Sequence, residues 1–110
     1  LYGVYMKNYL TDNELDKMEL IIGREISHLR KKKGLTGEQL GLLLGVSQQQ
    51  VSRYERAETK LAISMLCTIV NLLDISLPNF FERIFSKMEN DNQSFHQHSA
   101  FKLECHDLIY

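Results

Sequence analysis

Residues 37–56 read GEQLGLLLGVSQQQVSRYER, and this stretch decides the fold. Gly37, Gly41 and Gly45 follow one another at intervals of four residues, and Val51 comes six residues later. Gly45 suits a tight turn because glycine adopts a positive φ without strain, and Gly41 lets two helices approach each other closely. The spacing predicts two short helices joined by a turn, which is the helix-turn-helix arrangement.

The second of these helices, expected from Gln48 to about Arg56 with Ser47 as its cap, has a polar outer face. In a helix-turn-helix the second helix lies in the major groove of DNA, and its N-terminal residues face the base edges. The residues on this face are Gln48, Gln49, Gln50, Ser52 and Arg53. Glutamine can bond adenine through two hydrogen bonds, and arginine can do the same with guanine. The alternative is a helical hairpin whose glutamine-rich face is only solvated.

Helices are also expected on the N-terminal side of this stretch. Thr11–Lys33 predicts a long helix that Thr11 or Asp12 caps and Gly34 ends. Its apolar residues recur at helical spacing and are Leu15, Met18, Ile22, Ile26 and Leu29. Thr36 and Gln39 form a capping-box pattern at the start of the next helix. That helix is expected to bury Leu40, Leu43 and Leu44.

Two more helices are expected on the C-terminal side. The first, from about Ile63 to Leu73, would bury Met65, Leu66, Ile69 and Leu73. The second opens at Leu77-Pro78, because proline is favoured in a first helical turn, and its core side is Phe80, Phe81, Ile84 and Phe85. From Met88 to Ser99 the chain turns polar, which predicts a loop or linker. The expected fold class is all-α, a five-helix repressor-like domain with a helix-turn-helix and a C-terminal extension.

Three segments follow from this pattern: residues 1–10 as an N-terminal arm with Met6 as a candidate native start, 11–87 as the helix-turn-helix domain, and 88–110 as a linker and C-terminal arm. The C-terminal arm regains apolar residues, namely Phe101, Leu103, Leu108, Ile109 and Tyr110. An isolated monomer would expose them unless the arm folds back on its own domain. We therefore expect a homodimer to which this arm contributes.

The composition narrows the class of protein. A chain of 110 residues with 44% apolar and 25% charged residues is typical of one folded domain. No apolar run reaches the roughly 20 residues of a membrane helix, and the first ten residues do not resemble a signal peptide. Two cysteines without a CxxC pair favour a reducing, cytoplasmic location. The net charge is −1, but residues 22–60 alone carry +4, which is typical of a nucleic-acid-binding face and also of a solvated helix face.

The motifs Ile22-Gly23-Arg24, Gly34-Leu35-Thr36, Leu44-Gly45-Val46-Ser47 and Val51-Ser52-Arg53-Tyr54-Glu55 resemble the Cro/CI family of regulators, also called XRE-type, over about residues 20–82. The nonapeptide 47–55 further resembles the MrpJ-type regulators that are encoded with fimbrial operons in enteric bacteria. The resemblance implies double-stranded DNA as the partner, with a palindromic operator, and control of fimbrial or motility genes by a bacterial regulator.

The resemblance also implies residue roles. Base-reading roles fall on Gln48, Gln49, Ser52 and Arg53, and phosphate-contacting roles on Arg30, Thr36, Ser47, Gln50, Arg56 and Lys60. Arg30 is expected to pair with Glu55. Three positions depart from the family pattern. Gly37 stands where a DNA-contacting glutamine is usual, Ala57 replaces a glycine, and Leu61 replaces a proline.

Other chemistry is less favoured. The residues His96, His98, Cys105 and His106 could suggest a metal site, but two of them lie in a polar stretch, and solvated surface is the simpler interpretation. No phosphate loop or nucleophile motif points to an enzyme, and no cofactor, metal or small-molecule ligand is predicted. Two function hypotheses remain: a sequence-specific DNA-binding regulator, or an antitoxin-like interaction module that uses the same fold to bind protein.

Overall fold

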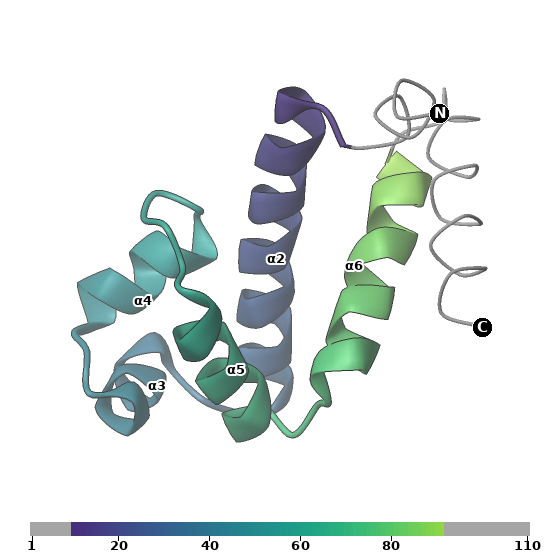
Figure 1. Ribbon diagram of the computed structural model, residues 1–110. Coiled ribbons are helices and arrows are strands. Elements are labelled where there is room, and N and C mark those ends of the chain that lie inside the picture. Colours follow the sequence, from purple (N-terminus) through teal and green to yellow (C-terminus); the bar gives the residue numbers. More distant parts are fainter. Residues whose placement is uncertain (1–9, 92–110) are drawn as a thin grey trace.

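The computed structural model describes residues 10–91, which form five helices (Figure 1). These are α2 (Asp12–Lys32), α3 (Gly37–Leu44), α4 (Gln48–Glu55), α5 (Ile63–Leu72) and α6 (Leu77–Asp91). No strand lies between residues 10 and 91, so the all-α prediction is confirmed. The predicted terminal arms are residues 1–10 and 88–110, and most of both arms, residues 1–9 and 92–110, lies outside the described range. The apolar residues expected at the dimer interface lie outside it as well.

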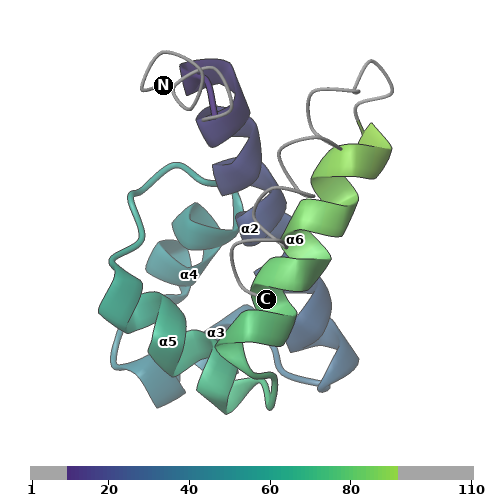
Figure 2. The ribbon, with the colours of Figure 1, turned by 45° about the vertical axis from the view of Figure 1, so that its right-hand side comes forward.

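The long helix α2 stands at the centre of the arrangement. In Figure 1, α6 runs antiparallel along one side of α2, and α3 and α4 lie on the other side. The view in Figure 2 shows the same order, with α5 in front of α3 and joined to the start of α6. The helix-turn-helix pair α3–α4 is therefore mounted on α2, while α6 covers the opposite flank.

The core lies where α2, α5 and α6 meet. Its buried residues are Ile21, Ile26, Leu66, Ile69, Val70, Leu73, Phe80, Ile84 and Met88. Each fully buried side chain of this kind contributes roughly 1.5–3 kcal/mol to folding. The predicted core side of α6 is confirmed for Phe80 and Ile84, which are fully buried, while Phe81 and Phe85 pack at its edge.

A capping box begins α2 and a glycine follows its end, as the sequence predicts. Thr11 Oγ1 accepts a hydrogen bond from the Glu14 backbone N–H, and the Glu14 side chain accepts one from the Thr11 N–H, a complete capping box. Gly34 follows the helix with φ of +80°, a conformation that glycine adopts without strain. The chain then turns directly into α3.

Two sequence predictions about these helices are wrong. Leu43, expected on the buried side of α3, is 57% exposed, because only Leu40 of that helix points fully inward. The loop expected from Met88 does not begin there, since α6 continues to Asp91. Met88 itself is 2% exposed, because it stands one turn after Ile84 on the face that packs into the core.

One charged side chain lies inside the core. Glu25 of α2 is 1% exposed, and its Oε2 accepts a hydrogen bond of 2.6 Å from Arg83 Nε of α6. Its Oε1 lies 3.4 Å from Lys87 Nζ, also on α6. These two cations offset the cost of burying the carboxylate and attach α6 to α2. Sequence reasoning missed Glu25; its spacing of three residues from Ile22 and four from Leu29, on the apolar face of α2, was the signal.

Among residues 10–91, no single helix is long and apolar enough to cross a membrane, and α5 and α6 meet that length and composition test only as a pair bent by 100°.

Candidate nucleic-acid interface

The turn between α3 and α4 is built around two glycines. Gly45 ends α3 in the left-handed conformation, with φ of +75°. A Cβ at Gly41 would lie 2.7 Å from the carbonyl oxygen of Val46, so the chain can double back only if residue 41 has no side chain. Leu40 and Val51 are buried between the two helices. Both predicted glycine roles are confirmed, and the angle of α4 relative to α3 follows from them.

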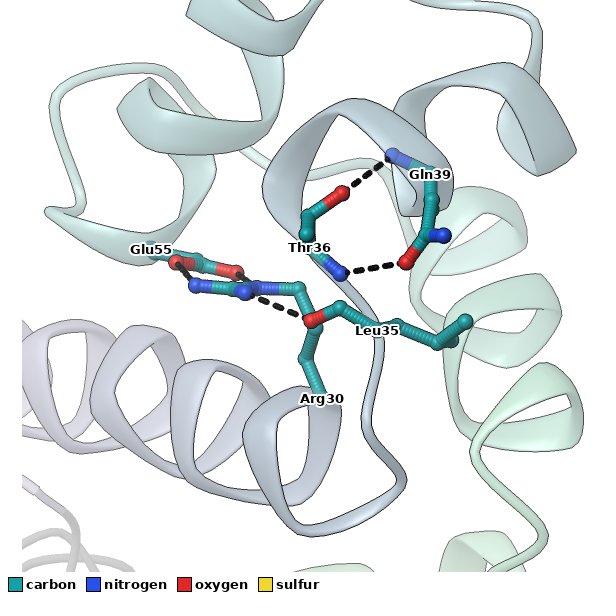
Figure 3. A network of polar contacts seen from close by, with 5 residues as sticks. All are labelled: Arg30, Leu35, Thr36, Gln39 and Glu55. Carbon is teal, nitrogen blue, oxygen red and sulfur yellow. Dashed lines mark hydrogen bonds and ion pairs between the residues drawn. The ribbon is translucent and has the colours of Figure 1, made fainter.

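Side-chain caps begin both helices. Thr36 Oγ1 accepts a hydrogen bond of 3.0 Å from the Gln39 N–H, and Gln39 Oε1 accepts one of 2.8 Å from the Thr36 N–H (Figure 3). Ser47 Oγ accepts a 3.1 Å hydrogen bond from the Gln50 N–H at the start of α4. Each N-terminus keeps backbone N–H groups that no helical carbonyl satisfies, and these favour a nearby anion.

The outer face of α4 carries the predicted base-reading residues. Gln48, Gln49 and Arg53 are exposed; Gln49 and Arg53 lie on the side of the helix away from buried Val51, and Gln48 stands at its first position. Ser52 and Gln50 are half-buried at the margins of this face. Arg53 has no carboxylate partner among residues 10–91. Three long polar side chains therefore extend from α4 with their hydrogen-bonding groups available.

A largely buried ion pair fixes α4 against α2. Arg30 Nε donates to Glu55 Oε2 at 2.6 Å and Arg30 Nη2 donates to Glu55 Oε1 at 3.1 Å, with side chains 12% and 11% exposed (Figure 3). Arg30 Nη1 donates to the Leu35 carbonyl at 2.8 Å, so one guanidinium connects α2, the turn before α3, and α4. The hydrogen bond to Glu55 raises the pKa of Arg30 above its ordinary value, despite the opposing effect of burial.

The expected pairing of Arg30 with Glu55 is thus present. Its geometry assigns Arg30 first to positioning α4, because the carboxylate and the Leu35 carbonyl take up hydrogen bonds from all three guanidinium nitrogens. A contact between Arg30 and phosphate remains a prediction.

A second feature of the α2–α4 contact escaped sequence reasoning. A Cβ on Gly23 would stand 2.4 Å from the Glu55 carbonyl oxygen and 2.9 Å from that of Tyr54. No side chain fits this gap, so Gly23 permits the close approach that brings Arg30 within reach of Glu55. The glycine in the middle of a helix was the available signal, since glycine lowers helix stability unless packing requires it.

The loop after α4 holds the remaining predicted phosphate contacts. Arg56 pairs with Glu58 at 3.1 Å, and Lys60 Nζ lies 3.1 Å from Glu19 of α2; both cations are exposed. Between them, Ala57 has φ of +58°. The turn needs a residue in the left-handed conformation here, which suits the glycine that the resemblance implied at this position.

The described residues offer no candidate metal site on this surface or elsewhere. Residues 10–91 contain no group of three His, Cys, Asp or Glu side chains placed to hold a metal ion. The residues weighed for such a site, His96, His98, Cys105 and His106, lie outside the described range.

Comparison with known proteins agrees with this geometry. A helix-turn-helix family model matches residues 26–80. An uncharacterized HTH-type transcriptional regulator of Rickettsia conorii is 33% identical over 91 residues, which is 82% of this chain and 71% of that protein. A regulator of the same description from Rickettsia prowazekii is also 33% identical and aligns with 82% of this chain and 68% of its own length. One from Sinorhizobium fredii is 30% identical over 80 residues, 73% of this chain and 53% of the relative.

The fold and its buried contacts define a helix-turn-helix protein of the Cro/CI type, and the chain belongs to that helix-turn-helix family. No solved structure matches it.

Proposed function

We propose that this protein is a sequence-specific DNA-binding transcriptional regulator that inserts α4 into the major groove. The observation that carries the proposal is the exposed set Gln48, Gln49 and Arg53 on a helix that buried Val51 and paired Glu55 hold in place. Rigid mounting matters because base recognition requires hydrogen-bonding groups at set distances. Glutamine would select adenine, and arginine would select guanine. Ser52, at the margin of the same face, completes the base-reading set.

The surrounding polar groups fit contacts with the DNA backbone. The capped N-termini at Thr36 and Ser47 present backbone N–H groups, and Gln50 stands in the first turn of α4. Arg56 and Lys60 add exposed cations after α4. Their surface ion pairs with Glu58 and Glu19 are weak, so a phosphate can replace the carboxylates. These contacts would position the protein without reading sequence.

We further propose that the protein binds a palindromic operator as a homodimer. An α4 of eight residues reaches few base pairs, and a second copy would add a half-site about 34–36 Å away, one turn of DNA. The resemblance of residues 47–55 to fimbrial-operon regulators makes fimbrial and motility genes the first candidate targets. Such a protein acts in the cytoplasm, where the DNA is.

Selection from random duplex DNA at about 0.15 M salt tests the proposal. The full chain should enrich one sequence motif, and the variant Gln48→Ala/Gln49→Ala/Arg53→Ala should not, while both retain the same helical circular dichroism. Enrichment of the same motif by the variant would contradict the assignment of α4. Absence of DNA binding by the natural chain would overturn the proposed function.

One observation favours a second candidate. Leu42 and Leu43 are 77% and 57% exposed side by side on α3, where they could contact another protein. An interaction module of the antitoxin-like type would use this surface and would enrich no DNA sequence. The same selection experiment therefore separates the two candidates.

A further inference from the structure

A basic groove runs between α2 and α4, beside the face of α4 that we assign to base reading. It holds an open hollow of about 360 Å³. Its lining includes Arg24, Ser27, His28 and Lys31 from α2, Ser52 from α4, and Arg56 at the end of α4. The resemblance of the sequence to Cro/CI regulators gives no DNA-binding role to Arg24, Ser27, His28 or Lys31.

Helical spacing accounts for the groove. Arg24, His28 and Lys31 are separated by four and then three residues, which places them along one face of α2. The absence of a side chain at Gly23 draws α4 close to α2 at the base of the groove. The three basic side chains are exposed, so their charged or polar ends are available at its rim.

The basic side chains that α2 contributes to the groove are not neutralised by the protein. Arg24, His28 and Lys31 have no ion-pair partner in the part of the chain that the structure describes. Glu55, the acidic residue in the lining, is held in two hydrogen bonds by Arg30. Arg56, also in the lining, pairs with exposed Glu58. Several cations outside the groove also have carboxylate partners, namely Lys33 with Asp74, Lys60 with Glu19, and Arg83 and Lys87 with Glu25.

We propose that this groove binds phosphates of the DNA backbone next to the site that α4 reads. The inference rests on the proposed function. Ser52 belongs both to the groove and to the margin of the reading face, so DNA that receives α4 passes directly alongside Arg24 and Lys31. Arginine and lysine bind phosphate oxygens, and the hydroxyls of Ser27 and Ser52 can donate to the same oxygens.

A free phosphorylated ligand offers the same chemistry, but the DNA backbone is the better occupant. The charged side chains lie spread along more than one helical turn at an exposed rim, which suits a row of phosphates. They do not converge on one enclosed point. Contacts of this kind strengthen binding to all DNA sequences equally.

The test compares the full chain with two variants whose folding is checked by circular dichroism. Arg24→Gln/Lys31→Gln removes two charges from the groove, and Lys17→Gln is the matched control. Lys17 is also on α2 and also lacks a carboxylate partner within residues 10–91, but it does not line the groove. Affinity for the selected site and for unrelated duplex DNA is measured from 50 to 300 mM salt.

The double variant should bind both DNAs more weakly by the same factor. Its plot of log affinity against log salt should be shallower by about 1.8, since each phosphate contact contributes about 0.9 to the slope. Lys17→Gln should leave the slope within error of the natural chain. If the natural chain binds its site and the double variant keeps the full slope, the groove proposal is wrong and the proposed function stands. If the natural chain binds no DNA, both are wrong.

A second arm distinguishes the source of the phosphate. Inorganic pyrophosphate is titrated into ¹⁵N-labelled full chain while the backbone amides of residues 24–31 are followed. Pyrophosphate binding at these amides below about 1 mM, together with an unchanged salt slope for the double variant, would assign the groove to a small phosphorylated ligand and overturn the DNA assignment. Weak amide shifts, no larger than those that added salt causes, together with the shallower salt slope of the double variant support the assignment of the groove to DNA phosphates.

Discussion

Glu55, the last residue of α4, accepts two hydrogen bonds from Arg30 in the last turn of α2, at 2.6 and 3.1 Å. The same guanidinium donates to the Leu35 carbonyl just before α3. One side chain therefore connects the central helix with both helices of the helix-turn-helix. The direction in which Gln48, Gln49 and Arg53 point depends on this connection.

Removal of the Glu55 carboxylate should lower the stability of the fold strongly. Glu55→Ala leaves Arg30 largely buried without its partner, and we expect the free energy of unfolding to fall by about 3 kcal/mol. Glu58→Ala is the matched control, because it breaks the exposed pair with Arg56 and should cost less than about 1 kcal/mol. Urea unfolding measures both. Equal losses from the two variants would show that the buried pair contributes no more than an exposed one.

Glu25 should respond differently to two substitutions. Glu25→Ala leaves a cavity and removes the partner of Arg83 and Lys87, so we expect a loss of about 3–5 kcal/mol. Glu25→Met fills the same space without a charge to desolvate, and both cations are exposed enough to regain water. The methionine variant should lie within about 1.5 kcal/mol of the natural chain by thermal unfolding. A methionine variant as unstable as the alanine variant would contradict this account.

Alanine substitutions at Gly23 and Gly37 should differ in their effect on stability. Gly23→Ala forces a Cβ to 2.4 Å from the Glu55 carbonyl, which α2 and α4 can relieve only by separating. We expect a loss of about 2–3 kcal/mol and weaker DNA binding, because the contact sets the orientation of α4. Gly37→Ala meets its nearest atom, Gln48 Cγ, at an ordinary 3.6 Å. Alanine also favours the helix there, so this control should be neutral or slightly stabilising. If Gly37→Ala lost more stability in denaturant than Gly23→Ala, the close packing of α2 against α4 at Gly23 would not be what limits stability.

Ala57 offers a stabilising substitution. Its φ of +58° is unfavourable for alanine and free of strain for glycine. Ala57→Gly should raise the free energy of unfolding by about 0.5–1 kcal/mol, after the added entropy of the unfolded chain is subtracted. The counterpart is Gly34→Ala, at φ of +80° with no atom within 4 Å of the added Cβ, which should lose about 1 kcal/mol through strain alone. A lower melting temperature for Ala57→Gly, or a higher one for Gly34→Ala, would show that backbone strain does not determine the stability at these two positions.

Local chemistry made much of this fold predictable from the sequence. A capping box needs only Thr36 and Gln39 three residues apart, and a left-handed turn needs only Gly45, so both could be identified without knowledge of the tertiary structure. The ion pair between Arg30 and Glu55 followed from a family resemblance that covers most of the described helices.

The remaining features depend on neighbours that are distant in the sequence. The burial of Glu25 is tolerable only because α6 supplies Arg83 and Lys87, which are separated from it by about sixty residues. Periodicity placed Leu43 on a buried face, but the buried residues of α3 are Leu40 and Gly41, and Leu43 lies away from them at 57% exposure. Met88 is followed by a run of polar residues that suggests a loop, and only its spacing of four residues from Ile84 indicates that α6 continues past it.

The central claim is that α4 reads bases, and a measurement of discrimination tests it most directly. Fluorescence anisotropy compares affinity for the selected site with affinity for the same site altered at one base pair. Arg53→Lys keeps the charge and removes the two-bonded contact, so it should lose about 1–3 kcal/mol of discrimination at one position only. Lys60→Gln should weaken both duplexes alike. If Arg53→Lys retains the full discrimination of the natural chain at every position, Arg53 does not read bases and the account is contradicted.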